Sequence, residues 1–399
     1  MNRRRELVIA GGGLGAARAI KSYREAGGEG RISLIGEEAT LPYHRPALSK
    51  RYLRGESTET PHVENEAFYR EHAVDAELET RVVAVDPAAR AVTLDDRTRL
   101  GYDKLLLVTG ATPRRLNVPG ADLDGVFSLR TVADSAAIRD AAGAAERAVV
   151  VGAGFIGMEA AASLRRLGLE VTLVHRGRDL FEQLGSPELS EQLAALYGEH
   201  GVELLLGHEV ASFGGDTVLT HVETNNGRRI AADLAVVGVG VVPNVDFLTG
   251  SGLAVDNGIV VNARFETDAP GVYAAGDVAS FFDPLYARQR RIEHWSNASY
   301  QGGEVGRILA GAAGGYDNVS SFFSEVFGTT IKVLGDVSRF DTLTTQGSLA
   351  DGFLASYGNE GRLVGALTVG QSEELETLVK GLIGERAPAD ALEQELIAA

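Results

Sequence analysis

LVIAGGGLGAARAI at residues 7–20 and AVVVGAGFIGMEAAASL at residues 148–164 decide the fold of this 399-residue chain. Each stretch runs from an apolar strand through a glycine-rich loop into an alanine-rich helix. The spacings are Gly11-x-Gly13-x-x-Ala16 and Gly152-x-Gly154-x-x-Gly157. The first glycine allows the sharp turn, the second lets the backbone approach a pyrophosphate, and the third small residue lets helix and strand pack closely. One such loop is a weak signal, but two predict a protein that holds two dinucleotides at two helix N-termini.

The composition excludes several classes of protein. Fifty-five acidic residues against 38 Lys plus Arg give a net charge of −17, which argues against nucleic acid or an anionic membrane as the general partner. The chain has no cysteine, so disulfide-reductase and cysteine-dependent peroxidase activities are excluded, as are thiolate metal sites. Its eight histidines show no metal-ligand spacing, and we expect no metal.

The size and the start of the chain bear on its organisation and location. A length of 399 residues predicts two or three domains. The basic start followed by apolar residues resembles a signal peptide, but glycines and then Arg18 and Lys21 interrupt it, and cleavage there would destroy the first loop. The apolar stretch at residues 234–243 is too short to span a bilayer. We therefore expect a soluble cytoplasmic protein.

Other segments predict the elements around the two loops. RISLIGEE at residues 31–38 reads as a second strand, with Glu37 and Glu38 placed to accept hydrogen bonds from a ribose. Residues 80–96 alternate as two strands around a DPAA turn, and residues 128–142 read as a capped helix. From Ser320 onward the pattern predicts antiparallel strands followed by a charged helix.

Eight segments, in chain order, resemble one family. They are GGGLGAA, LPYHRPALSK, TGATPRRL, SLRT, GAGFIGMEAA, GVGVVPN, YAAGDVA and EHWSNA. This ordered set is similar to the ferredoxin-reductase-like flavoproteins, which are the NAD(P)H-dependent reductase components of P450 and dioxygenase systems and have apoptosis-inducing-factor-like relatives.

The resemblance implies an α/β fold with two doubly wound dinucleotide-binding domains plus a smaller α+β C-terminal domain. The FAD domain would be discontinuous, at residues 1–114 and 244–319. Residues 115–243 would bind NAD(P)H, and residues 320–399 would cover the flavin.

The resemblance also implies the FAD contacts. Gly11, Gly13, Leu14 and Gly15 would meet the pyrophosphate, and Glu37 the ribose. Arg45 and Lys50 would contact the pyrophosphate or the flavin, and the backbone of Val83 would flank the adenine. The other expected contacts, from the ribityl chain to the pyrimidine side of the flavin, are Thr109, Gly110, Arg130, Asp277, His294 and Trp295.

The second loop is expected to bind the nicotinamide coenzyme and to serve hydride transfer from nicotinamide C4 to flavin N5. Its expected coenzyme contacts are Gly152, Gly154, Phe155, Ile156, Gly157, Glu159, His175, Arg176 and Gly240. By resemblance, Glu159 points toward the nicotinamide–flavin interface and pairs with Lys50, whose charge would stabilise reduced flavin. Lys50 and Glu159 are therefore the candidate catalytic residues.

Coenzyme choice follows from the end of the second strand in the nicotinamide fold. NADH-using members of the family carry an acid there, whereas this chain reads VHRGR, with His175, Arg176 and Arg178. Cations suit a 2′-phosphate and cannot accept from a 2′-hydroxyl as a carboxylate does. We therefore expect NADPH to be favoured over NADH.

The electron acceptor is expected to be a ferredoxin-type [2Fe-2S] protein. Arg288, Arg290 and Arg291 would form a basic rim that docks this acidic partner, although a solvated charge run fits the same residues. Two alternatives stay open. One is a stand-alone NAD(P)H oxidase or quinone reductase. The other is a redox-sensing protein like the apoptosis-inducing-factor relatives, which residues 322–336 resemble.

Overall fold

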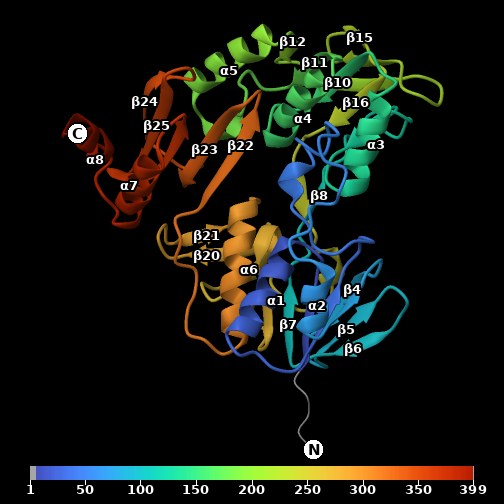
Figure 1. The fold of residues 1–399 in the computed structure, drawn as a ribbon, viewed down its shortest axis with the longest axis vertical. Coiled ribbons are helices and arrows are strands. Elements are labelled where there is room, and N and C mark those ends of the chain that lie inside the picture. The colour runs from blue at the N-terminus through green and yellow to red at the C-terminus, as the bar shows by residue number, and fades with distance from the viewer. Residues whose placement is uncertain (1–5, 399) are drawn as a thin grey trace, which may run out of the picture. The chain divides into compact units, whose positions relative to one another are not determined.

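The computed structural model describes residues 6–398, and the chain divides into two compact units (Figure 1). The first comprises Met1–His44, Thr60–Thr112 and Val242–Asn318, and the second comprises Arg45–Glu59, Pro113–Val241 and Val319–Ala399. The basic start of the chain, at residues 1–5, lies outside the described residues.

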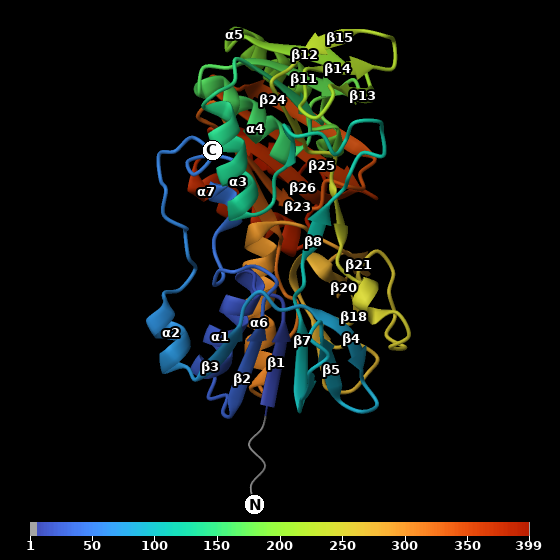
Figure 2. The ribbon, with the colours of Figure 1, turned by 90° about the vertical axis from the view of Figure 1, so that its right-hand side faces the viewer.

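A five-stranded parallel sheet forms the centre of the first unit, in the order β19-β7-β1-β2-β3 (Figure 2). Its strands are β1 (Glu6–Ala10), β2 (Arg31–Ile35), β3 (Val74–Glu77), β7 (Lys104–Leu107) and β19 (Val272–Ala274). After a charged first residue, the inner strands are buried along the rest of their length, as strands covered on both faces require. Helix α1 (Leu14–Glu25) connects β1 to β2 and begins at the first glycine loop.

Helix α6 (Trp295–Leu309) packs directly against α1. A Cβ added at Gly302 or Gly306 would overlap the backbone of Gly15 or Ala19, so the absence of side chains lets the helices approach this closely. The contact fixes the N-terminus of α6 relative to the N-terminus of α1.

Smaller elements complete the first unit. They are α2 (Glu66–Glu71), the antiparallel sheet of β4 (Val82–Asp86), β5 (Ala91–Leu94) and β6 (Arg99–Gly101), the sheet of β18 (Ile259–Val261), β20 (Ala279–Asp283) and β21 (Arg288–Arg290), and the short 3-10 helices η3 (Asp246–Leu248) and η4 (Gly276–Val278). Strands β8 (Ala111–Pro113) and β17 (Val241–Pro243) pair with each other. The two expected strands around the DPAA turn are confirmed as β4 and β5.

A second five-stranded parallel sheet lies in the second unit, in the order β12-β11-β10-β16-β9. Its elements are β9 (Val126–Ser128), α3 (Val132–Ala142), β10 (Arg147–Val151), α4 (Phe155–Arg166), β11 (Glu170–His175), α5 (Pro187–Glu199), β12 (Val202–Leu206) and β16 (Leu234–Val237). The expected capped helix is confirmed as α3, whose Thr131 and Asp134 form a reciprocal capping box. The short η1 (Arg45–Ala47), η2 (Glu182–Leu184) and a sheet of β13 (Val210–Gly214), β14 (His221–Thr224) and β15 (Arg229–Ala231) belong to the same unit.

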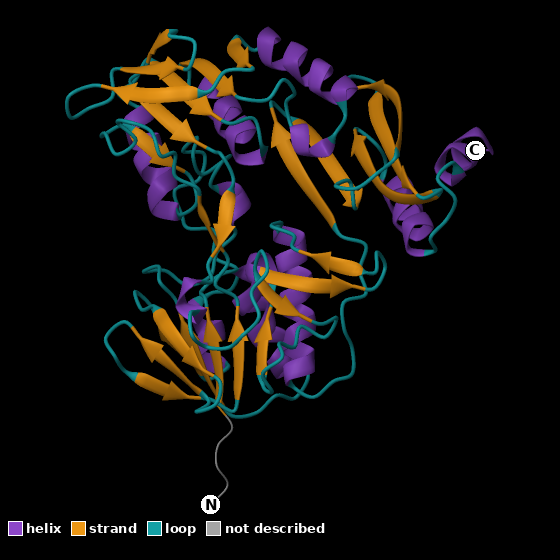
Figure 3. Ribbon diagram, turned by 180° about the vertical axis from the view of Figure 1, so that it is seen from behind, coloured by secondary structure: helices purple, strands orange, loops and turns teal. Residues whose placement is uncertain are grey.

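The C-terminal segment is antiparallel, as expected, and also belongs to the second unit (Figure 3). Its order is β22-β23-β26-β25-β24. The elements are β22 (Ser321–Val326), β23 (Thr329–Gly335), β24 (Thr342–Ser348), β25 (Gly352–Asn359), β26 (Arg362–Val369), α7 (Glu373–Gly384) and α8 (Ala391–Ala398). The expected charged helix is α7.

The mixed α/β class with doubly wound parallel sheets is confirmed. The units and the expected domains divide the chain at nearby residues, but residues 45–59 and 319–399 fall in the unit that contains the second glycine loop. The division into three domains stays a prediction. None of the helices in the described part of the chain is both long and apolar enough to cross a membrane.

Candidate dinucleotide sites

The first glycine loop leaves an open cradle at the N-terminus of α1. Gly11 has φ +118°, and a Cβ there would overlap the carbonyl of Val108, so only glycine fits this turn. Gly13 is the N-cap of α1, and a Cβ added to it would meet no protein atom within 4 Å. The space beside Gly13 is therefore available to a ligand.

The two loop helices begin differently from α2, α3, α5 and α7. The N-cap side chains Asn65, Thr131, Ser186 and Ser372 each accept a backbone hydrogen bond at the start of α2, α3, α5 and α7. By contrast, α1 and α4 begin at Gly13 and Gly154, with no side-chain cap and no acid in the first turn. Their free amides and positive dipole ends suit phosphate oxygens. This is the chemistry that a dinucleotide pyrophosphate requires.

Glu37 and Glu38 after β2 have different surroundings. The Tyr43 hydroxyl donates to Oε2 of Glu38 at 2.5 Å, whereas Glu37 is exposed and pairs with Arg81. The exposed Glu37 is the more accessible acceptor for a ribose. Val83 lies on β4 with its side chain 42% exposed.

Thr109 and Gly110 follow β7 and are held by Asn244. The Asn244 side-chain amide donates to the Thr109 carbonyl at 2.9 Å, and the Thr109 hydroxyl donates to the Asn244 carbonyl at 2.9 Å. The Asn244 backbone N–H donates to Gly110 at 3.0 Å. The turn at the carboxyl end of β7, where ligands of open parallel sheets bind, is therefore rigid.

Asp277, His294 and Trp295 are carried by two segments of the first unit that are tied together. Arg291 donates to the Asp277 carbonyl at 3.3 Å and pairs with Glu293, next to His294. Burial lowers the pKa of His294 to about 4, with the Asp277 carboxylate opposing, so this imidazole is neutral at pH 7.

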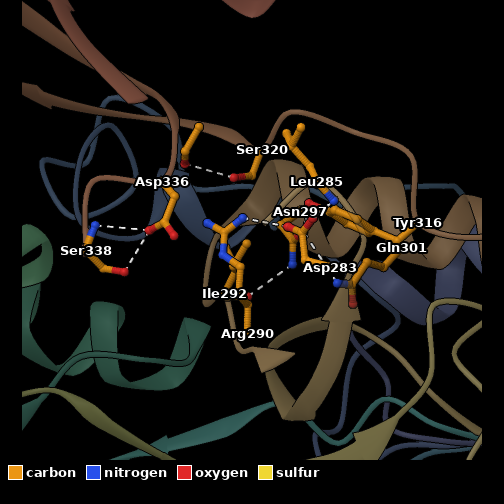
Figure 4. Close-up of polar contacts among 11 residues, drawn as sticks. Asp283, Leu285, Arg290, Ile292, Asn297, Gln301, Tyr316, Ser320, Asp336 and Ser338 are labelled. Atoms are coloured by element: carbon orange, nitrogen blue, oxygen red, sulfur yellow. Dashed lines mark hydrogen bonds and ion pairs between the residues drawn. The ribbon is translucent and has the colours of Figure 1, made fainter. Parts of the chain in front are cut away.

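Asn297 and Gln301 of α6 make buried polar contacts. The Asn297 amide donates to the Ile292 carbonyl at 3.2 Å (Figure 4). The Gln301 side-chain oxygen accepts from the Gly276 N–H at 2.8 Å. These bonds fix the turn before Asp277 and the segment before Trp295 against the same helix.

The second glycine loop repeats the geometry of the first. Gly152 has φ +105°, and a Cβ there would overlap the Gly238 carbonyl. Gly157 is buried, and its missing side chain admits the carbonyl of Gly152. Phe155 packs between Phe181 and Phe322 with ring centroids 5.0 Å from each.

Two other expected coenzyme contacts are open to solvent. Ile156 is 41% exposed, and Gly240, beyond β16, is exposed with φ +96°. The loop therefore presents an open face of the kind a coenzyme needs.

The end of strand β11, which bears on coenzyme choice, carries a hydrogen-bond donor at His175 and a cation at Arg176. Burial lowers the pKa of His175, with Glu182 opposing, so His175 is neutral at pH 7. Its Nδ1 accepts from the Ala153 N–H at 3.4 Å, which leaves the proton on Nε2. That Nε2 is buried, has no hydrogen-bond partner among the described residues, and lies 3.6 Å from the Glu182 carboxylate. Arg176 is exposed. The charge expected here belongs to the arginines, while His175 is a neutral donor.

Lys50 and Glu159 form a nearly buried ion pair in the second unit. Nζ of Lys50 lies 2.6 Å from Oε2 of Glu159, and their side chains are 11% and 5% exposed. The Ser324 hydroxyl donates to Oε1 of Glu159 at 2.7 Å, and the Ser49 hydroxyl donates to Oε2. The expected pairing of Lys50 with Glu159 is present, and the carboxylate has three donors rather than one.

Arg45 and Arg130 also lie together in the second unit. Nη1 of Arg45 donates to the Arg130 carbonyl at 2.7 Å, and the Arg130 N–H donates to Asp134 at 3.0 Å. The cation of Arg45 is thus held by the segment that starts α3.

The prediction that three arginines form an exposed basic rim is wrong for two of them. Arg290 is buried and pairs at 2.7 Å with Asp283, which is completely buried (Figure 4). The side chain of Arg291 is only 10% exposed and is used by Glu293 and Asp277. These charges are neutralised inside the first unit, by the carboxylate of Asp283 for Arg290 and by that of Glu293 for Arg291.

Several residues of the sites could not be found from motifs alone. Ser49, His44 and Asn244 lie inside quoted segments but carried no distinguishing signal, while Ser324, Gln301 and Glu182 lie outside them. Each acts through a partner remote in the sequence.

In the described part of the chain, no group of three or more His, Asp or Glu side chains could hold a metal ion.

Comparison with known proteins identifies the family. The model of the pyridine nucleotide-disulphide oxidoreductase family matches residues 5–302. The chain belongs to this family. Because it has no cysteine, it is a member whose own chain cannot perform disulphide chemistry.

Similar proteins within this family carry reductase names. The chain is 33% identical to putidaredoxin reductase CamA of Pseudomonas putida, covering 98% of this chain and 94% of the relative. It is 34% identical to a ferredoxin–NAD(P)+ reductase of a Sphingomonas species, covering 90% and 88%. The crystal structure of the covalent putidaredoxin reductase–putidaredoxin complex contains a chain with a TM-score of 0.93 and 32% identity, covering 100% of this chain and 99% of that one.

Proposed function

We propose that this protein is an FAD-dependent NAD(P)H reductase that passes single electrons to a ferredoxin-type iron–sulfur protein. The observation that carries the proposal is the pair of uncapped helix N-termini behind Gly13 and Gly154, one in each unit. The similarity to named ferredoxin reductases supports it.

The residues of the first unit fit FAD. The open side of Gly13 and the free amides of Leu14 and Gly15 suit the pyrophosphate, and exposed Glu37 suits the ribose. Asp277, His294 and Trp295 would meet the ribityl chain and the flavin ring. Bound FAD supplies the redox chemistry, by accepting a hydride and releasing electrons singly. The chain holds and orients the group.

The ion pair of Lys50 and Glu159 would act beside the reacting atoms. A lysine cation stabilises negative charge that develops on a reduced ring, and a carboxylate held by Ser49, Ser324 and Lys50 keeps that cation in place. No nucleophile of the chain is required.

The coenzyme is proposed to be NADPH in preference to NADH. Exposed Arg176 and the Nε2–H of His175 are donors suited to a 2′-phosphate. Exposed Glu182, 3.6 Å from Nε2 of His175, is a nearby carboxylate that could accept from a 2′-hydroxyl. The ratio of kcat/KM for NADPH over NADH tests this, and a strong NADH preference would contradict it.

The acceptor is tested by stopped-flow reduction of the yellow holoenzyme, followed by addition of a [2Fe-2S] ferredoxin. Cytochrome c reduction that depends on the ferredoxin supports the proposal. Rapid oxygen consumption by the protein alone would instead indicate a stand-alone oxidase. A long-lived complex of reduced flavin with oxidised coenzyme and slow turnover would indicate a redox sensor. Failure to bind FAD would overturn the whole assignment.

A further inference from the structure

Trp295, the single tryptophan of the chain, is hydrogen-bonded to a histidine 251 residues away in the sequence. Its Nε1 lies 3.0 Å from Nδ1 of His44, and the ring centroids are 5.6 Å apart at an interplanar angle of 45°. The indole is 37% exposed and occupies the first position of α6. Since the indole N–H can only donate, Nδ1 of His44 must be the acceptor.

Both partners sit on backbone that is fixed independently of their contact. The His44 N–H donates to the Pro61 carbonyl at 2.8 Å, and the preceding Tyr43 is buried with its hydroxyl bonded to Glu38. Trp295 is fixed by the close packing of α6 against α1. The imidazole therefore meets the indole without ordering a mobile loop.

We propose that His44 is the positioning residue of Trp295, holding the indole in one orientation at the N-terminus of α6. This inference rests on the proposed function only where it assigns Trp295 to the flavin ring. His44 itself touches no reacting atom in this role. It acts by fixing the rotation of the aromatic ring.

The contact exists only for neutral His44. A protonated imidazole has an N–H on both nitrogens, so it opposes the indole N–H instead of accepting from it. Burial lowers the pKa of His44, the Arg18 cation adds to this, and Glu64 opposes. Lys21 binds Glu64 at 3.1 Å, and on the α6 side the nearest titratable groups in sequence are His294 and Glu293. The lowered pKa keeps the contact intact at neutral pH.

The test uses the holoenzyme labelled with ¹⁵N. One tryptophan gives one indole N–H cross-peak, whose proton shift moves downfield when the N–H is hydrogen-bonded. His44→Asn keeps an acceptor oxygen near the position of Nδ1 but does not titrate, whereas His44→Leu removes the acceptor. His62→Asn, at an exposed histidine in the segment that pairs with Tyr43, is the matched control.

At pH 7.5 we expect the wild type, His44→Asn and His62→Asn to share the downfield position, and His44→Leu to lie upfield. On acidification to pH 4.5 the wild-type peak should move upfield with a midpoint below 6.5, while His44→Asn shows no such transition. His294 titrates separately near pH 4 and remains in both proteins. Equal positions in His44→Leu and wild type, or an unchanged midpoint in His44→Asn, would overturn the inference.

Flavin reduction by NAD(P)H provides the functional readout. In His44→Leu the rate constant should fall roughly 3-fold to 10-fold at unchanged coenzyme KM, with recovery in His44→Asn. If the cross-peak follows His44 but the rate constant does not, the positioning of Trp295 stands and its assignment to the flavin ring fails. The two failures are thereby distinguished.

Discussion

Lys50 Nζ lies 2.6 Å from Oε2 of Glu159, and both side chains are almost excluded from water. Removing two charges from water carries a large desolvation cost, which close contact alone seldom offsets. Here the hydroxyls of Ser49 and Ser324 add two further hydrogen bonds to the carboxylate. The arrangement joins α4, β22 and the segment after η1.

Replacing Lys50 by Met should destabilise the protein and slow its chemistry. The variant leaves the Glu159 carboxylate buried without its cation, for which we expect the free energy of unfolding to fall by about 3–5 kcal/mol. Urea unfolding and stopped-flow flavin reduction check the two effects. Arg51→Met, at the exposed neighbouring position, is the control and should change neither.

Gly13→Ala should abolish tight FAD binding without disturbing the fold. No protein atom lies within 4 Å of the added methyl group and φ is −98°, so only a ligand can meet it. We expect the apoprotein Tm to be unchanged and the FAD affinity to fall more than about 10-fold, equivalent to 1.4 kcal/mol. Gly198→Ala, equally free of neighbours, is the control. Tight FAD binding by Gly13→Ala would contradict the proposal that the space beside Gly13 receives FAD.

Arg176→Ala should reduce the preference for NADPH. Loss of a charge-assisted hydrogen bond to a 2′-phosphate corresponds to about 1.5–3 kcal/mol, or roughly 10- to 150-fold in kcat/KM for NADPH. The value for NADH should change little. Arg70→Ala, on the exposed face of α2, controls for net charge. A parallel loss for both coenzymes would show that Arg176 does not read the phosphate.

Arg290→Met should destabilise the first unit through its partner. Burial raises the pKa of Asp283 and the Arg290 cation opposes this, so the variant leaves a fully buried carboxyl without its cation. We expect a loss of about 3–5 kcal/mol, with much of it recovered in the Asp283→Leu/Arg290→Met double variant. Thermal unfolding of the three proteins checks this. Additive losses in the double variant would contradict the pairing.

His294 should make the protein sensitive to mild acid. Its pKa of about 4 in the folded state lies below the ordinary 6.5, so the unfolded chain binds the proton first. The free energy of unfolding should therefore fall as the pH decreases from about 6.5 to about 4, by at most about 1.4 kcal/mol per unit. Chemical unfolding at a series of pH values measures this slope. His294→Asn should flatten it, and an unchanged slope would show that another group is responsible.

The elements recovered from the sequence are those set by local rules. Gly11 and Gly152 need a positive φ that only glycine adopts readily, and Thr131 with Asp134 forms a capping box within four residues. Alternation around Pro87 marked the hairpin of β4 and β5. Such patterns depend on neighbours along the chain, so the sequence displays them directly.

The arginines at residues 288–291 show what local sequence patterns cannot predict. Arg290 and Arg291 look like exposed charge in the sequence, yet one pairs with buried Asp283 and the other with the Asp277 turn. Whether a cation faces water or a carboxylate depends on what the fold brings beside it. No spacing rule encodes that choice.

The sequence by itself determined the two strand–loop–helix units and the family, because short-range spacing dictates the turns that receive a pyrophosphate. Only the tertiary structure decided which polar side chains meet. Ser324 reaches Glu159 across 165 residues, and His44 reaches Trp295 across 251. Hydrogen bonds need their atoms within about 3 Å, and that proximity arises from packing of whole elements rather than from order along the chain.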